Sequence, residues 1–127
     1  MEEFTVRTAA KCEVLDVTPQ VCAMMKKSGN ACLVHVPHTT TGITINEFEP
    51  NIRADYADFF TRLAPPADYR HNKVDSNAEA HLISAIIKPS VLVPMDKGRL
   101  ALGTWQRILL VEADGPRERK IYVQVLQ

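Results

Sequence analysis

The sequence predicts an α+β fold in one domain over residues 1–127, with helices on one side of a mainly antiparallel sheet. Three observations carry this prediction. Residues 3–17 alternate between apolar and polar side chains, which is typical of strands. Two segments in the middle of the chain have helical spacing, and the last third has the pattern of an antiparallel meander. The chain is long enough for one domain with its own hydrophobic core.

Strands and a short helix are expected in the first third of the chain. Thr18 suits an N-cap and Pro19 suits the first helical position, so a helix should run to Met25. The surrounding segments are rich in valine, isoleucine and threonine, and they predict strands at residues 3–17, 31–36 and 42–47.

Two helices are expected in the middle of the chain. Pro50 suits the start of the first, and its apolar side chains recur on one face until a pair of prolines ends it. These side chains are Ile52, Tyr56, Phe59 and Leu63. The second helix covers residues 76–87, where Ser76 and Glu79 are expected to form a capping box.

The remaining residues are expected to form strands joined by short turns. Turns are predicted at "DKGR" and "DGPR", which contain residues that favour turns. Gly103 lies inside the longest of these segments and predicts a β-bulge or a close backbone approach. The expected strands are residues 90–95, 100–113 and 120–127.

Charge and composition argue against several classes of function. The formal net charge is zero, with acids and bases interspersed, so neither a general nucleic-acid binder nor an anionic-membrane binder is expected. The N-terminus lacks the basic start and apolar core of a signal peptide, and no apolar run reaches the length of a membrane span. Cys12, Cys22 and Cys32 show no CxxC pairing, and we interpret them as structural thiols of a cytoplasmic protein.

The stretch "VHVPHTTTGITINE", residues 34–47, is the first candidate site. His38 follows a strand end and precedes three threonines, and loops held by rigid strands often carry functional side chains. The alternative is a turn whose hydroxyls satisfy nearby backbone groups, but the gathering of polar side chains slightly favours function. Glu47 shares the strand face of Ile43 and Ile45, so we expect it to be partly buried and to need a partner.

The other histidines and Asp55 give weaker signals. His35 lies inside an apolar strand and is interpreted as a core or sheet-face residue. His71 and His81 flank the expected capping box, and His81 lies one helical turn from Asn77. Histidines with carboxylates suit zinc or another divalent metal, although spacing alone favours paired or surface histidines. Asp55 by itself favours a helix-surface role.

Arg117 and Arg119 alternate onto one strand face after the "DGPR" turn. Two guanidinium groups in this arrangement suit a phosphate or a carboxylate. The alternative is that Arg117 and Arg119 belong to an ordinary charged hairpin end. This alternative is favoured unless the fold brings Gln106 and the histidines close to the two arginines. The sequence contains no P-loop, GxGxxG, GxSxG or Cys–His motif, so nucleotide binding by a familiar loop is not supported.

Five motifs follow one another along the chain: "HTTTGITINE", "YRHN", "DSNAEAH", "GRLALGTWQRI" and "DGPRERK". Together they resemble the YjbQ family of small bacterial and archaeal proteins, often labelled secondary thiamine-phosphate synthase. The resemblance implies a half-barrel-like mixed sheet with helices and assembly as a homotrimer. It also implies one pocket close to a subunit boundary, lined by His38, Thr40, Asn46, Glu47, Asp55, His71, Asn77, His81, Gln106, Arg117 and Arg119.

The resemblance implies an enzyme that joins a pyrimidine carrying a diphosphate to a thiazole phosphate. Arg117 and Arg119 would hold phosphate, while the three loop and helix histidines would bind a divalent metal, with zinc the first candidate, or relay protons. Glu47 and Asp55 would orient these histidines. Neutral hydrogen bonds would come from Thr40, Asn46, Asn77 and Gln106. The alternative function is a trimer that binds a phosphorylated metabolite or a metal without turnover, as a sensor or carrier.

Overall fold

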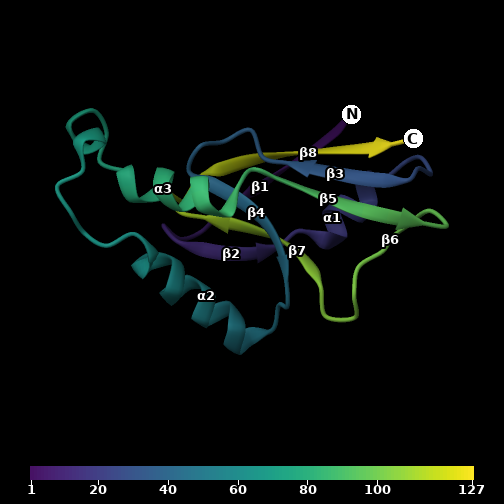
Figure 1. Cartoon of the computed structure of the whole chain (residues 1–127), viewed down its shortest axis with the longest axis horizontal. Helices are drawn as coiled ribbons and strands as arrows, with labels where there is room; N and C mark the ends of the chain where they lie inside the picture. Colours follow the sequence, from purple (N-terminus) through teal and green to yellow (C-terminus); the bar gives the residue numbers. More distant parts are fainter.

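Two antiparallel sheets pack face to face in the computed structural model, which describes residues 1–127 (Figure 1). The five-stranded sheet contains, in spatial order, β1 (Glu2–Arg7), β8 (Glu118–Leu126), β3 (Ala31–His35), β5 (Ser90–Asp96) and β6 (Arg99–Leu100). The three-stranded sheet contains β2 (Glu13–Asp16), β7 (Arg107–Glu112) and β4 (Thr41–Asn46). Together the sheets form a curled half-barrel, which confirms the expected α+β class.

The two longer helices lie on one side of the sheets, as expected. Helices α2 (Pro50–Leu63) and α3 (Ala78–Ile87) cover the outer face of the three-stranded sheet (Figure 1). Helix α1 (Thr18–Met24) packs against β1 and β7. The short 3-10 helix η1 (Arg70–Lys73) follows α2 in the chain and contacts α3. None of these helices has both the length and the apolar character needed to cross a lipid bilayer.

Strand β7 belongs to both hydrophobic cores. Ile108 and Leu110 face the five-stranded sheet and join the core between the sheets. Leu109 and Val111 face the other way and join the core beneath α2 and α3. Because β7 is buried on both faces, its sequence is a continuous apolar run without polar alternation. The strand ends on a fully buried carboxylate, Glu112.

The start of α1 differs slightly from the prediction. The N-cap is Val17, and Thr18 is the first helical residue instead of the cap. The Thr18 hydroxyl accepts a hydrogen bond from the Ile108 amide at 2.8 Å, and the Thr18 amide donates to Asp16 Oδ1 at 3.0 Å. The threonine side chain therefore ties the helix to β7, which is a tertiary contact that local sequence does not predict.

The predicted capping box of α3 is wrong. The helix begins at Ala78 with Asn77 as its N-cap, and Ser76 lies outside it. The Ala78 amide donates to Asn72 Oδ1 at 3.0 Å, so a side chain from η1 satisfies a free helix amide in place of Ser76. This frees Asn77 for contacts with other side chains.

The long strand predicted over residues 100–113 is also wrong in its first half. Residues 101–106 form a loop, and Gly103 lies in it, so the predicted β-bulge does not occur. The Gly103 amide donates to Gln106 Oε1 at 2.8 Å, which stabilises the loop internally. Strand β6 pairs with β5 over two residues, and one more backbone bond follows, from the Ala101 amide to the Pro94 carbonyl at 2.8 Å, before the chain leaves the sheet.

The "DGPR" connection crosses between the two sheets and does not close a hairpin. Strand β7 lies in the three-stranded sheet, whereas β8 lies between β1 and β3 in the other sheet. A side chain at Gly115 would collide with the backbone of Ala10 and with the Thr8 hydroxyl, so glycine permits the close passage here. The crossing places the start of β8 opposite the end of β7.

His35 is a sheet-face residue, as predicted. It is half-buried on the face of β3 opposite to that of the core residue Val34. Its ring stacks on Tyr122, and its Nδ1 lies 2.6 Å from Ser90 Oγ. These contacts explain the histidine structurally, within the five-stranded sheet.

Candidate functional site

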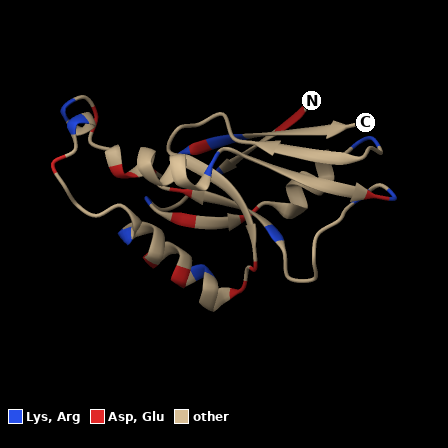
Figure 2. Ribbon diagram, viewed as in Figure 1, with Lys and Arg blue, Asp and Glu red and all other residues tan.

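Basic and acidic residues are spread over strands, helices and loops in the view of Figure 2. An anion site in this protein is therefore expected as a local pocket. One pocket of about 350 Å³ has an almost wholly polar lining. It lies where the segment after β3, the start of α3 and the crossing turn into β8 meet, and its lining residues are Pro37, His38, Thr39, Thr40, Asp75, Asn77, His81, Asp114, Arg117 and Arg119. We call it the polar pocket.

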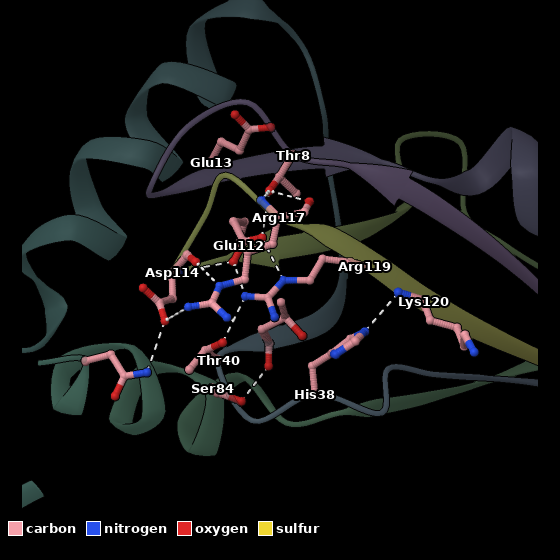
Figure 3. A network of polar contacts seen from close by, with 12 residues as sticks. Thr8, Glu13, His38, Thr40, Ser84, Glu112, Asp114, Arg117, Arg119 and Lys120 are labelled. Carbon is pink, nitrogen blue, oxygen red and sulfur yellow. Dashed lines mark hydrogen bonds and ion pairs between the residues drawn. The ribbon is translucent and has the colours of Figure 1, made fainter. Parts of the chain in front are cut away.

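A buried ion pair forms the inner wall of the polar pocket. Arg119 is 4% exposed and Glu112 is 0% exposed. The Arg119 Nε donates to Glu112 Oε2 at 2.8 Å, and Nη2 donates to Glu112 Oε1 at 2.5 Å (Figure 3). Nη2 also donates to Thr40 Oγ1 at 2.8 Å. These three bonds fix the guanidinium plane. They use Nε and Nη2 only, so Nη1 takes part in none of them.

Further contacts satisfy the Glu112 carboxylate. The Asp114 amide donates to Glu112 Oε1 at 3.0 Å. The Thr8 hydroxyl donates to Glu112 Oε2 at 2.8 Å. The same hydroxyl oxygen accepts a hydrogen bond from the Arg117 amide at 2.8 Å. A buried carboxylate with this many donors is held in one place, and it holds Arg119 in turn.

Arg117 lies at the outer rim of the same pocket. Its side chain is 54% exposed, and its Nη2 donates to Asp114 Oδ2 at 2.9 Å. Asn77 Nδ2 donates to the same carboxylate oxygen at 3.0 Å, and Asn77 Oδ1 lies 2.9 Å from His71 Nε2. The N-cap of α3, the crossing turn and η1 are therefore connected by one series of hydrogen bonds.

The backbone of β8 fixes the tautomer of His38. The Lys120 amide donates to His38 Nε2 at 2.8 Å (Figure 3). An amide can only donate, so Nε2 carries the lone pair and the proton of the neutral ring is on Nδ1. Burial, and then the Arg119 charge, lower the pKa of His38 below its ordinary value of 6.5. The side chain is therefore a neutral hydrogen-bond donor at neutral pH.

We predict that His38 titrates only below pH 6.5. The unfolded chain takes up this proton at a higher pH than the folded one, so the contribution of His38 to stability is complete above pH 6.5 and is lost as the pH falls through the folded pKa. An NMR titration of the ring protons checks this directly. A midpoint at or above 6.5 would contradict the described environment of the ring.

The three histidines predicted as metal ligands do not form a set of three. The His71 and His81 rings lie edge to face, with centroids 4.7 Å apart. His38 Nε2, by contrast, accepts a hydrogen bond from the Lys120 amide. No three or more side chains of His, Cys, Asp or Glu are arranged to hold a metal ion. The side chains of the single chain therefore do not form a zinc site. Metal binding by the protein remains an untested prediction.

The comparisons with known proteins identify the family. The family model described as "UPF0047 protein YjbQ-like" matches residues 2–127. This chain belongs to the YjbQ-like family. The UPF0047 protein of Archaeoglobus fulgidus is 45% identical over 98% of this chain and 99% of its own length. YugU of Bacillus subtilis, also named a UPF0047 protein, is 35% identical over 99% of this chain and 98% of its own.

Solved structures of relatives show the same YjbQ-like fold. A hypothetical protein of Aeropyrum pernix K1 has a TM-score of 0.94 and 44% identity, covering 98% of this chain and 96% of that one. An uncharacterised YjbQ/UPF0047 protein of Clostridium acetobutylicum has a TM-score of 0.91 and 34% identity, covering 99% and 100%. These descriptions give a family and a fold, and they name no activity.

Five of the predicted site residues do not line the polar pocket of this YjbQ-like chain. Strand β4 carries Thr41 opposite Glu112 at one end and Asn46 opposite Arg107 at the other. One of the five, His71, is exposed but contacts the pocket residue Asn77. The other four are exposed and lie elsewhere: Asn46, Glu47, Asp55 and Gln106. The expectations that Glu47 is partly buried and shares a cavity with His38 are wrong for the single chain, because β4 ends at Asn46 and the chain turns outward into α2.

Sequence reasoning missed three acidic residues of the site. Asp75 and Asp114 line the polar pocket, and Glu112 supports it from behind. Glu112 did leave a signal, because a carboxylate at the end of the apolar run "ILLV" needs a cationic partner when it is buried. Asp75 and Asp114 lie in turn segments, where aspartate is common for local reasons.

Proposed function

We propose that the polar pocket binds the phosphate group of a small molecule. The observation that carries this proposal is the buried Arg119, which Glu112 and Thr40 hold in one orientation at the pocket wall. Arg117 adds a second guanidinium at the rim, and neutral His38 adds an Nδ1–H donor. Fixed donors that converge on one cavity bind an oxyanion well, because little reorganisation is needed when it arrives.

The proposed reaction joins a pyrimidine carrying a diphosphate to a thiazole phosphate. The C–O bond between the pyrimidine methylene carbon and the diphosphate breaks, and the diphosphate leaves with the bonding electrons. The lone pair of the thiazole nitrogen forms the new C–N bond, which gives thiamine phosphate. Arg117 and Arg119 stabilise the charge that develops on the leaving oxygen, and no step passes through a metal.

A second candidate function is binding of a phosphorylated metabolite without turnover. It is favoured by the positions of Glu47 and Asp55, because neither lines the pocket that contains His38 and His81. Incubation with both substrates and chromatography of the product separates the two functions. Thiamine phosphate that accumulates in proportion to enzyme supports the reaction, whereas saturable binding without product supports the second candidate.

Replacing Arg117 with alanine tests phosphate binding without disturbing the buried pair. We expect the affinity for methyl phosphate to fall about tenfold, because one charge-assisted contact is lost at the rim. The matched control is Arg62→Ala, since Arg62 is also exposed but lies on α2 and forms no ion pair. Isothermal titration calorimetry measures both. An equal affinity of Arg117→Ala and wild type would remove Arg117 from the phosphate site.

We also propose that the protein is a homotrimer whose subunits share the site. Large apolar side chains are left uncovered on the single chain, with Trp105 72% exposed and Leu92 58% exposed. The proposed role of the trimer is to bring exposed residues of a neighbouring subunit, such as Glu47 and Asp55, to the pocket that lacks them in the single chain. Light scattering should give three times the 14.2 kDa chain mass at micromolar concentration. A monomer mass would contradict the assembly.

A further inference from the structure

The polar pocket has no apolar wall. Of its ten lining residues, only Pro37 lacks a polar side chain. Its volume of about 350 Å³ is near the lower end of the range for small-molecule sites. The faces of a ring or an alkyl chain would find no apolar surface to pack against in this pocket. The part of the ligand that lies beside the phosphate should therefore be small and polar on all sides.

One carboxylate of the polar pocket has no partner. Asp75 lines the pocket, yet it takes part in none of the five ion pairs of the chain. The side-chain hydrogen bonds of its segment come from His71, Asn72 and Asn77 instead. Asp114, the other lining carboxylate, receives two donors on its Oδ2. Because a free carboxylate repels phosphate, a site for phosphate alone gains nothing from Asp75.

The backbone holds Asp75 in place. Its amide donates to the His71 carbonyl at 3.0 Å, and its carbonyl accepts from the Asn77 amide at 2.9 Å. These two bonds join the end of η1 to the N-cap of α3. The free carboxylate therefore comes from the α3 end of the pocket, while the Arg119 guanidinium comes from β8.

Two neutral groups of the pocket are also free. The Thr39 hydroxyl and the His81 ring nitrogens line it without a hydrogen bond to the rest of the chain. A carboxylate only accepts, whereas a hydroxyl both donates and accepts, as does a neutral imidazole through its two nitrogens. A ligand hydroxyl can donate to Asp75 and accept from Thr39 or His81 at the same time. An ammonium group can only donate, so it leaves the second contact unmade.

We infer that the polar pocket takes the phosphate monoester of a small polyol, with a free hydroxyl on a carbon next to the ester. The phosphate lies against Arg119 and His38, and the hydroxyl donates to Asp75. This inference rests on the proposed phosphate binding and adds the class of the ligand. It belongs with the second candidate function, because neither partner of the proposed joining reaction carries a free hydroxyl. Asp75 is then the residue that determines specificity.

The test compares sn-glycerol 3-phosphate with n-propyl phosphate by isothermal titration calorimetry. The two probes have the same phosphate and the same number of carbons, and they differ by two hydroxyls. The wild type should bind glycerol phosphate about tenfold tighter, because a hydrogen bond to a charged group is gained. Asp75→Ala should remove this preference. It should also bind propyl phosphate about twofold to threefold tighter than the wild type, because a repelling charge is gone.

The matched control is Asp68→Ala. Asp68 is exposed like Asp75, and it lies in the segment between α2 and η1, outside the pocket lining. The control removes the same charge from the chain and should keep the wild-type affinities for both probes. Urea denaturation checks that Asp75→Ala is folded, which is expected because its side chain is exposed and has no partner to lose.

The outcomes separate the inference from the proposed function. Equal wild-type affinity for the two probes would overturn the polyol and leave the phosphate site standing. A preference for glycerol phosphate that survives Asp75→Ala would place the hydroxyls elsewhere and overturn the inference. A third probe, O-phosphoethanolamine, carries an ammonium group, and tighter binding of it than of glycerol phosphate would also overturn the polyol. If no phosphate ester binds, the phosphate site and the polyol are both wrong.

Discussion

Replacing Glu112 with methionine is expected to destabilise the fold by about 3–5 kcal/mol. The substitution leaves the Arg119 guanidinium charged, 4% exposed and without its carboxylate partner. Chemical denaturation with urea measures the free energy of unfolding. The matched control is Glu118→Met, because Glu118 is exposed at the start of β8 and should change stability by no more than about 0.5 kcal/mol. A similar small loss for Glu112→Met would mean that the pair is solvated and does not organise the site.

Replacing both partners of the ion pair is expected to separate folding from function. The double variant with Glu112→Met and Arg119→Met should unfold within about 1.5 kcal/mol of the wild type, because no unpaired charge is left in the core. Its affinity for methyl phosphate should nevertheless fall about tenfold to a hundredfold, since the fixed guanidinium of the polar pocket is gone.

Calorimetry and urea denaturation of the same double variant check both halves of this prediction. Unchanged phosphate binding in a folded double variant would show that Arg119 is only structural. The double variant could instead be as unstable as Glu112→Met alone. Removing the Arg119 charge would then have restored no stability, and the destabilisation by Glu112→Met would come from altered packing.

The elements with local signals were predictable from the sequence. Helix α2 begins at Pro50 and ends at Leu63, as its apolar spacing and prolines indicate. The Glu49 carboxylate caps it by accepting from the Asn51 and Ile52 amides, and these two bonds hold the pKa of Glu49 below its usual range. Such contacts join residues that are near one another in the chain, so periodicity and capping rules detect them.

Features set by the tertiary fold were not predictable in the same way. Residues 101–106 were predicted to continue a strand, but the chain leaves β5 after the bond from the Ala101 amide to the Pro94 carbonyl and forms a loop. The ion pair of Glu112 and Arg119 depends on the connection between β7 and β8, which crosses from one sheet to the other. The predicted meander would have made this connection a hairpin within one sheet. Local patterns carry no information about which sheet a strand joins.

The candidate site was predictable in part for the same reason. His38, Thr40 and Arg119 meet because β3, β4 and β8 begin or end at one edge of the half-barrel. Glu47 was assigned to this site by resemblance, and the single chain places it beyond the opposite end of β4. A resemblance transfers residues without saying which subunit contributes them, so it cannot place Glu47 in the pocket of its own chain.

The most direct test of the phosphate site is a crystal structure of the protein grown with saturating (4-aminopyrimidin-5-yl)methyl diphosphate. We predict phosphate density in the polar pocket, within hydrogen-bond distance of the Arg119 guanidinium and of His38 Nδ1. The Arg119 side chain should keep its bonds to Glu112 and Thr40. Diphosphate bound at another surface, or a polar pocket without phosphate density at saturation, would contradict the proposed site.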